Sequence, residues 1–151
     1  MVRFADDVVM GFRNQRDAQR VLEALSGRLS RFGLSAHPDK TRLVRFVKPG
    51  GSDRKGSDTF DFLGFTHYWG KSRKGNWVIK RKTVRKRLNK ALRGIAAWCR
   101  SNRHLPVAEQ HKKLCQKLKG HFAYYGITGN IRCLYTYVEK VKRCWRKWLD
   151  R

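Results

Sequence analysis

The sequence lacks the apolar features of a membrane or exported protein. No apolar stretch approaches the roughly 18 residues that a membrane-spanning helix needs. The N-terminus has no basic segment followed by an apolar run and a small-residue cleavage site, which together make a signal peptide. We therefore expect a cytoplasmic protein with no membrane partner.

Acidic residues are also scarce. The 151 residues include 11 Asp and Glu against 36 Lys and Arg, which gives a formal net charge of +25. Residues 71–119 contain 17 basic residues and one acid, Glu109. Such self-repulsion disfavours a compact chain unless a polyanion neutralises it. We expect that polyanion to be nucleic acid, whose phosphates release counterions when Lys and Arg bind. An anionic membrane surface is the less favoured alternative, because aromatic residues suited to base contacts are interleaved throughout.

The cysteines lack the spacing of a metal site. Cys99, Cys115, Cys133 and Cys144 are far apart, with no Cys-x-x-Cys and no paired Cys/His spacing, which argues against zinc. Each falls within an expected helix, where a free cysteine behaves as a small apolar residue. In a cytoplasmic protein we expect these thiols to be reduced.

Two adjacent acids, Asp6 and Asp7, contrast with this basic background. Short apolar runs flank them, Met1–Phe4 before and Val8–Phe12 after, which is typical of a β-hairpin with acids at its tip. Carboxylate oxygens suit Mg²⁺. A pair of such ions can clamp the attacking and leaving oxygens of a phosphoryl transfer. The alternative is an ordinary acidic turn, because Asp is common in turns.

The rest of the first half mixes helical and strand patterns. Apolar residues recur at helical spacing from Ala18 to Phe32, and Asn14 and Gly33 are suited to begin and end that helix. We expect the helix to pack on the sheet that contains the hairpin. A turn is expected at His37–Asp39 and a polar loop at Pro49–Asp58. Strands are predicted at Thr41–Val47, at Phe60–Phe65 with a break at Gly64, and at Trp77–Lys80 after a turn from Gly70 to Gly75.

After residue 80 the pattern is helical. Apolar spacing predicts helices over residues 82–101 and 107–125 and a last helix capped by Asn130. Short connections between amphipathic helices are typical of a small bundle. We therefore predict an α+β protein in two parts. Residues 1–80 would form a short antiparallel sheet with one packed helix, and residues 81–151 a three-helix bundle.

Four motifs in this order resemble those of the reverse transcriptase/maturase proteins encoded by group II introns. Residues 2–9 resemble the central active-site hairpin, although Phe4 stands where that family usually has tyrosine. Residues 33–41 resemble the next palm motif with its lysine, and residues 60–65 the hairpin that grips the primer. Residues 118–126 resemble the signature of the maturase (X) domain. The resemblance implies that residues 1–80 are the C-terminal part of a polymerase palm and residues 81–151 a thumb/X maturase domain.

The resemblance also implies roles for particular residues. Asp6 and Asp7 would be the catalytic, metal-binding carboxylates, and Lys40 would lie near the incoming triphosphate. The primer grip would be formed by Phe62, Leu63 and Gly64. Nucleic acid would be bound by the densest basic stretch, namely Lys80, Arg81, Lys82, Arg85, Lys86, Arg87, Lys90 and Arg93.

The implied function is that of an RNA-directed DNA polymerase of a mobile element. It would extend a DNA primer on an RNA template with dNTP and Mg²⁺, and it would bind group II intron RNA to support splicing. The family's fingers and an upstream metal-binding Asp have no counterpart in this sequence. We therefore expect the chain alone to be inactive as a nucleotidyltransferase, with a separately encoded N-terminal half as a possible partner. The alternative is a non-enzymatic basic RNA-binding module with a vestigial active-site hairpin.

Overall fold

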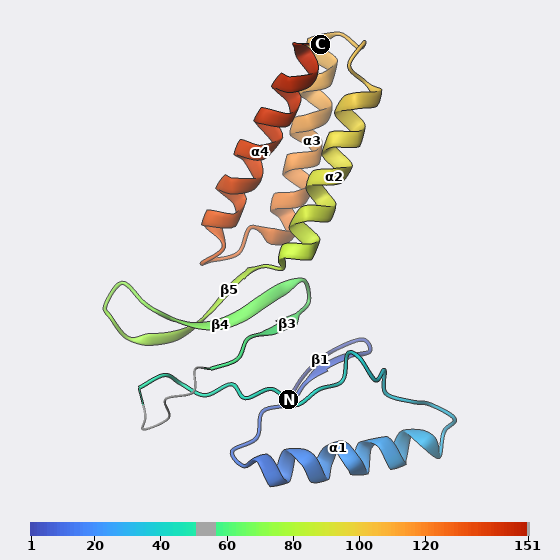
Figure 1. Cartoon of the computed structure of the whole chain (residues 1–151), viewed down its shortest axis with the longest axis vertical. Helices are drawn as coiled ribbons and strands as arrows, with labels where there is room; N and C mark the ends of the chain where they lie inside the picture. The colour runs from blue at the N-terminus through green and yellow to red at the C-terminus, as the bar shows by residue number, and fades with distance from the viewer. Residues whose placement is uncertain (51–56, 151) are drawn as a thin grey trace. The chain divides into compact units, whose positions relative to one another are not determined.

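The computed structural model describes residues 1–50 and 57–150 and has the predicted mixed α+β fold (Figure 1). The chain divides into two compact units, Met1–Leu63 and Gly64–Arg151. Most of the loop predicted at Pro49–Asp58 lies outside the described residues. No helix in the described part of the chain is long and apolar enough to cross a membrane.

The first unit begins with the predicted hairpin. Strands β1 (Val2–Phe4) and β2 (Asp7–Val9) are antiparallel, and Phe4 lies opposite Asp7. The connection consists of Ala5 and Asp6, and Ala5 has a φ of 51°. A positive φ is typical of the tight two-residue turns that match the twist of a hairpin. The two aspartates therefore lie at the tip, as predicted.

Helix α1 (Gln15–Ser30) begins after Asn14, as predicted, although the Asn14 side chain makes no capping hydrogen bond. Gly33 ends it with a φ of 68°. The Leu34 N–H donates to the Leu29 carbonyl at 3.0 Å, which completes a glycine-terminated cap. No residue of α1 is buried. The helix thus packs less closely than its pattern predicts, because a hairpin of two three-residue strands offers little apolar surface.

The strand predicted at Thr41–Val47 does not form. The turn before it does, since the Lys40 and Thr41 N–H groups both donate to the His37 carbonyl, at 3.2 and 2.9 Å. Residues 41–48 are irregular. A strand requires a paired neighbour, and β1 and β2 pair with each other in a two-stranded sheet. The alternating apolar residues therefore have the pattern of a strand, but they belong to neither of the described sheets.

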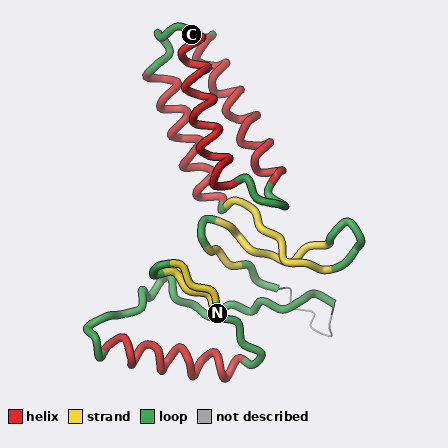
Figure 2. Tube along the Cα trace, turned by 180° about the vertical axis from the view of Figure 1, so that it is seen from behind, coloured by secondary structure: helices red, strands yellow, loops and turns green. Residues whose placement is uncertain are grey.

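The second unit contains a long two-stranded ribbon (Figure 2). Strands β4 (Phe65–Lys71) and β5 (Trp77–Thr83) are antiparallel, whereas β3 (Phe60–Phe62) belongs to the first unit and precedes them in the chain. The turn predicted from Gly70 begins later, at Ser72, because Gly70 still pairs with Val78. Strand β5 also runs past the predicted Lys80. The proposed division after residue 80 therefore falls within a strand and stays a prediction.

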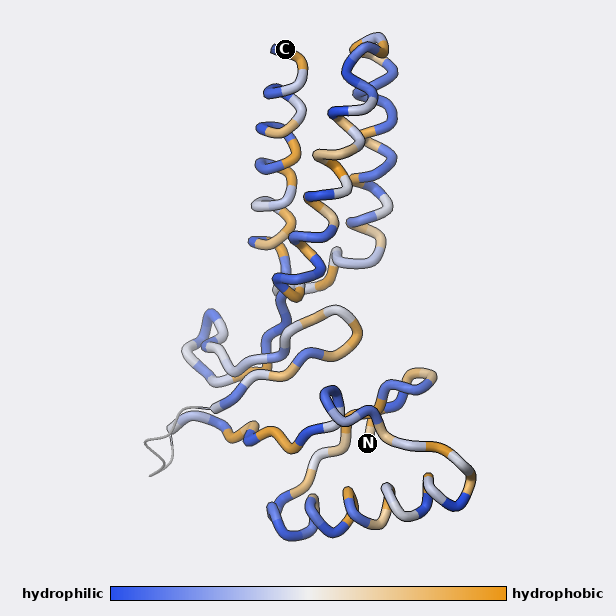
Figure 3. Tube along the Cα trace, turned by 45° about the vertical axis from the view of Figure 1, so that its right-hand side comes forward, coloured by the Kyte–Doolittle hydropathy of each residue, from blue (hydrophilic) through white to orange (hydrophobic). Residues whose placement is uncertain are grey.

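Three helices form the predicted bundle: α2 (Arg85–Ser101), α3 (Val107–Tyr125) and α4 (Ile131–Leu149). Apolar and polar positions alternate along each of them (Figure 3). Their apolar stripes meet in a core formed by Ile95, Cys99, Leu114, Tyr137 and Val141, against which Trp145 and Trp148 pack. Burial raises the pKa of the Cys99 thiol to about 11. The four cysteines are free and lie in helices, as predicted.

Two amides are buried in this unit with their hydrogen bonds satisfied. The Gln110 side chain donates to the Leu105 carbonyl at 2.7 Å and accepts from the Trp145 indole at 2.9 Å. Asn130 precedes α4, as predicted, but its side chain does not cap that helix. Its Oδ1 accepts the Thr83 N–H at 2.9 Å. Its Nδ2 donates to the Thr83 hydroxyl and to the Tyr125 carbonyl, both at 2.8 Å. Asn130 therefore joins the ends of β5 and α3 to the start of α4.

Candidate functional site

Asp6 and Asp7 are exposed at the tip of the β1–β2 hairpin. In the described structure neither carboxylate has a hydrogen bond or ion pair, so both are free to bind a cation. Mg²⁺ is commonly held by one or two carboxylates together with substrate phosphates and water. The two aspartates fit that use. Within residues 1–50 and 57–150, no group of three or more His, Cys, Asp and Glu is placed to hold a metal ion.

Lys40 lies at the end of the turn that the His37 carbonyl closes. Its side chain is exposed. No hydrogen bond or ion pair joins Lys40 to either aspartate in the described residues. Its expected role near a triphosphate therefore stays a prediction.

The predicted primer-grip residues form a tight turn between β3 and β4. Leu63 and Gly64, the two central residues, have φ of 49° and 78°. Positive φ at both positions is the type I′ arrangement of two-residue hairpins. For a non-glycine residue such as Leu63 this conformation costs on the order of 1 kcal/mol. The flanking strand alternates as predicted, with Phe60 and Phe62 half-buried and Asp61 exposed.

Gly64 lies against the segment that resembles the maturase signature. A Cβ atom on Gly64 would lie 3.3 Å from the Tyr125 hydroxyl oxygen. Phe65 stacks on Tyr124 with ring centroids 6.0 Å apart, and it meets the Tyr125 ring edge-on at 5.5 Å. Two motifs that are distant in sequence therefore share one aromatic cluster in the second unit. Sequence reasoning did not predict this contact, because it is determined by packing.

His121 extends the cluster toward the bundle core. Its ring stacks on Tyr137 at 3.9 Å between centroids and lies 4.6 Å from Tyr125. Burial lowers the pKa of His121. Its Nε2 is buried and has no hydrogen-bond partner among the described residues. A protonated ring would therefore place an unpaired charge between two tyrosines.

The stability of the protein is expected to fall as the pH drops below 6.5, the ordinary pKa of histidine. In that range the unfolded chain binds a proton at this position while folded His121 stays neutral until a lower pH. His121→Phe keeps an aromatic ring for stacking and removes the titrating group. Thermal unfolding midpoints measured from pH 7.5 to pH 5 should decline less steeply in the variant than in the wild type. Parallel declines would contradict this assignment.

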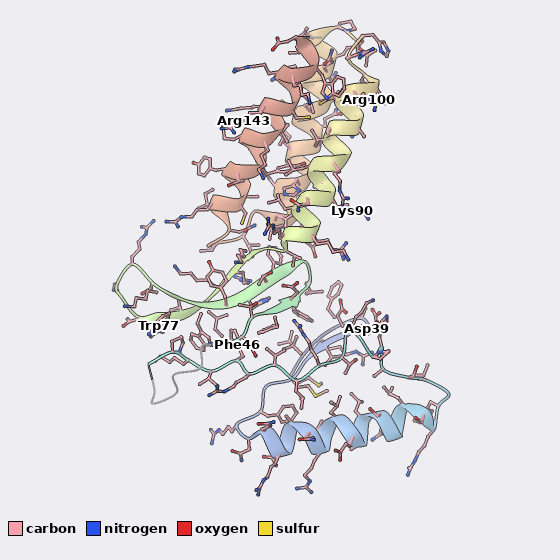
Figure 4. All side chains as sticks on the ribbon, in the orientation of Figure 1. Asp39, Phe46, Trp77, Lys90, Arg100 and Arg143 are labelled. Atoms are coloured by element: carbon pink, nitrogen blue, oxygen red, sulfur yellow. The ribbon has the colours of Figure 1, made fainter. Side chains whose placement is uncertain are left out.

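The predicted basic residues lie on β5 and on α2. All are exposed except Lys80, which is half-buried with its stem against Gly70. Figure 4 shows the side chains of Lys90 and Arg100 pointing outward from α2.

The first turn of α2 places positively charged side chains at the helix end that already carries partial positive charge. It consists of Arg85, Lys86 and Arg87, contains no acid, and follows Val84, which has no capping side chain. A helix N-terminus carries partial positive charge, so it repels the three cations, which also repel one another. Bound phosphate would relieve this repulsion, because helix N-termini and basic side chains both attract anions.

Comparison with known protein families matches residues 1–67 to the family described as reverse transcriptase (RNA-dependent DNA polymerase). This segment is similar to reverse transcriptases. The reverse transcriptase-like segment includes the Asp6 and Asp7 hairpin, the Lys40 turn and the turn at Leu63 and Gly64. It therefore contains every residue predicted to take part in polymerase chemistry. The search of curated proteins and the search of solved structures each found no match.

The basic residues from Lys80 onward lie outside the reverse transcriptase-like segment. Their assignment depends on charge, exposure and position on β5 and α2. The affiliation with group II introns likewise depends on the motif at residues 118–126 and stays a prediction.

Proposed function

We propose that this chain is part of a group II intron reverse transcriptase/maturase, an RNA-directed DNA polymerase that also binds intron RNA to support splicing. The observation that carries the proposal is the reverse transcriptase match over the hairpin whose exposed tip presents Asp6 and Asp7. The basic helical unit adds support, because 21 of the 25 net positive charges follow residue 70. Charge on this scale favours a polyanionic partner.

In the complete enzyme, Asp6 and Asp7 would hold Mg²⁺, with Asp6 the direct ligand and Asp7 in a supporting role. Bound metal supplies charge stabilisation during phosphoryl transfer. Lys40 would contact the triphosphate of the incoming dNTP and offset its negative charge. The turn at Leu63 and Gly64 would approach the primer, because a glycine lets another backbone come close. Intron RNA would contact the exposed basic residues of β5 and α2 through its phosphates.

The purified 151-residue chain is expected to bind RNA and to show no primer extension with dNTP and Mg²⁺. The reason is that no group of three or more His, Cys, Asp and Glu is placed to hold a metal ion among the described residues. Template-dependent DNA synthesis that Asp6→Asn abolishes would contradict the expected inactivity. Failure of the wild-type chain to bind RNA at low salt would contradict the proposed function.

The second candidate is a non-enzymatic RNA-binding module in which the aspartate hairpin is vestigial. It is favoured by the absence of a third potential metal ligand beside the pair among the residues described. Adding the separately produced N-terminal half of a group II intron reverse transcriptase distinguishes the two candidates. Synthesis that appears only with both parts, and that Asp6→Asn removes, supports the polymerase. RNA binding without synthesis in that mixture supports the module.

A further inference from the structure

The turn of the β4–β5 ribbon combines an aromatic ring with a cluster of cations. Lys71 and Trp77 are the last paired residues before the turn, and the Lys71 Nζ lies 5.7 Å from the centre of the Trp77 ring. Arg73 and Lys74 are exposed within the turn. Figure 4 shows Trp77 on this hairpin. We call Lys71, Arg73, Lys74 and Trp77 the hairpin tip. Because β5 leads into α2 from its other end, the tip lies at the end of the ribbon away from that connection.

The backbone of the tip is well defined by hydrogen bonds. The Ser72 N–H donates to the Asn76 carbonyl at 2.7 Å, and the Gly75 N–H donates to the Ser72 carbonyl at 3.1 Å. The Ser72 hydroxyl also accepts the Asn76 N–H at 3.2 Å. Gly75 has a φ of 80°, which a residue with a side chain adopts only with strain. The cations and the ring are therefore presented from a preorganised turn, which lowers the entropy cost of binding a ligand.

The tip is not explained by packing. Trp77 is half-buried and is absent from the residues that pack against the bundle core. No acidic residue occurs between Asp61 and Glu109, so no carboxylate near in sequence pairs with its three cations. A second aromatic–lysine pair occurs on the same ribbon, where the Lys82 Nζ lies 5.1 Å from the centre of the Tyr68 ring. Aromatic rings set among cations suit single-stranded nucleic acid, whose unpaired bases stack while its phosphates bind the charges.

We propose that the hairpin tip binds single-stranded nucleic acid, with Trp77 stacking on an unpaired base and Lys71, Arg73 and Lys74 binding the adjacent phosphates. This proposal deepens the proposed function, because it presumes that the basic unit binds nucleic acid and specifies the form bound at this position. A duplex offers phosphates but no unstacked base inside the helix. The tip should therefore discriminate between the two forms, whereas the cations of α2 should not.

The test compares wild type with Trp77→Leu in the full chain. The probes are a fluorescently labelled 12-nucleotide single-stranded RNA and a blunt-ended, two-strand RNA duplex of similar charge. Trp77→Leu is expected to raise the Kd for the single strand by about 5- to 150-fold, the range for loss of one stacked base. Its Kd for the duplex should change by less than about twofold. Tyr135→Leu is the matched control, because Tyr135 is an aromatic residue on α4 that is 68% exposed and lies outside the hairpin tip.

A second measurement changes the RNA instead of the protein, so that its result with the wild-type protein does not depend on the folding of a variant. Abasic sites in the 12-nucleotide RNA keep every phosphate and remove the bases that could stack. The wild-type protein should bind this RNA more weakly than the intact strand, and Trp77→Leu should bind both equally. Equal binding of the two RNAs by wild type, or equal losses on single strand and duplex, would overturn the stacking proposal. Failure of wild type to bind any RNA would instead overturn the proposed function.

Discussion

Replacing Asn130 with alanine is expected to lower the free energy of unfolding of the protein by about 2–4 kcal/mol, because a buried amide that satisfies other groups is lost. Asn130 is 1% exposed and Thr83 4% exposed. The variant leaves the Thr83 N–H without the acceptor that it has at 2.9 Å, and water has little access to replace it. It also removes the donor to the Thr83 hydroxyl and to the Tyr125 carbonyl. Urea unfolding followed by circular dichroism measures the change.

Asn14→Ala is the matched control for this experiment. Asn14 also precedes a helix, and neither asparagine caps its helix through its side chain. The Asn14 amide makes a long, exposed bond of 3.4 Å to Asp17. Its loss should cost less than about 0.5 kcal/mol, as is usual for a surface substitution. Equal losses in the two variants would show that the buried bonds of Asn130 add nothing beyond helix initiation.

The effect of Asn130→Ala should extend to the basic surface. Thr83 ends β5, and the next residue, Val84, donates its N–H to the Gly64 carbonyl at 3.0 Å. Asn130 therefore holds the segment from which the first turn of α2 begins. Loosening this segment would allow Arg85 and its neighbours to move relative to the aromatic cluster around Tyr125.

Features with a short-range cause could be predicted from the sequence. The Asp6 and Asp7 hairpin follows from apolar residues on both sides of a two-residue turn. The bounds of α3 follow from the start that Pro106 favours and from apolar residues at helical spacing. The turn at Gly64 was predicted as a break in a strand, because glycine is the residue that most readily takes positive φ.

Features that need a distant partner could not be predicted. The pattern at Thr41–Val47 is that of a strand, but hydrogen-bonded pairing decides whether a strand forms. The position before α4 identified Asn130 as a helix start, yet its side chain binds Thr83, which is 47 residues away. The stack of His121 on Tyr137 likewise joins two helices whose relative rotation the sequence does not give.

Reversing the charges of Arg85, Lys86 and Arg87 is expected to weaken RNA binding roughly 100-fold at about 0.1 M salt. Each Glu replaces a cation that would neutralise a phosphate with an anion that repels it. The slope of log K against log salt should become shallower by about 0.7–0.9 for each phosphate that the protein no longer neutralises. Folding should be preserved, because acids in the first turn of a helix interact favourably with its dipole. Filter binding over a salt series, with unfolding measured in parallel, tests both expectations.

A control variant with the same net charge distinguishes RNA binding at a local surface on α2 from a general electrostatic attraction of RNA to the whole basic protein. The control variant combines three substitutions at exposed positions of α3, namely Lys112→Glu, Lys113→Glu and Lys119→Glu. Each set of three reversals lowers the formal net charge from +25 to +19. If α2 presents the phosphate-binding surface, the α2 set should lose far more affinity than the α3 set. Equal losses of affinity in the two variants would mean that RNA binding depends on the total charge of the protein. Phosphate binding at the start of α2 would then no longer explain why three cations lie there.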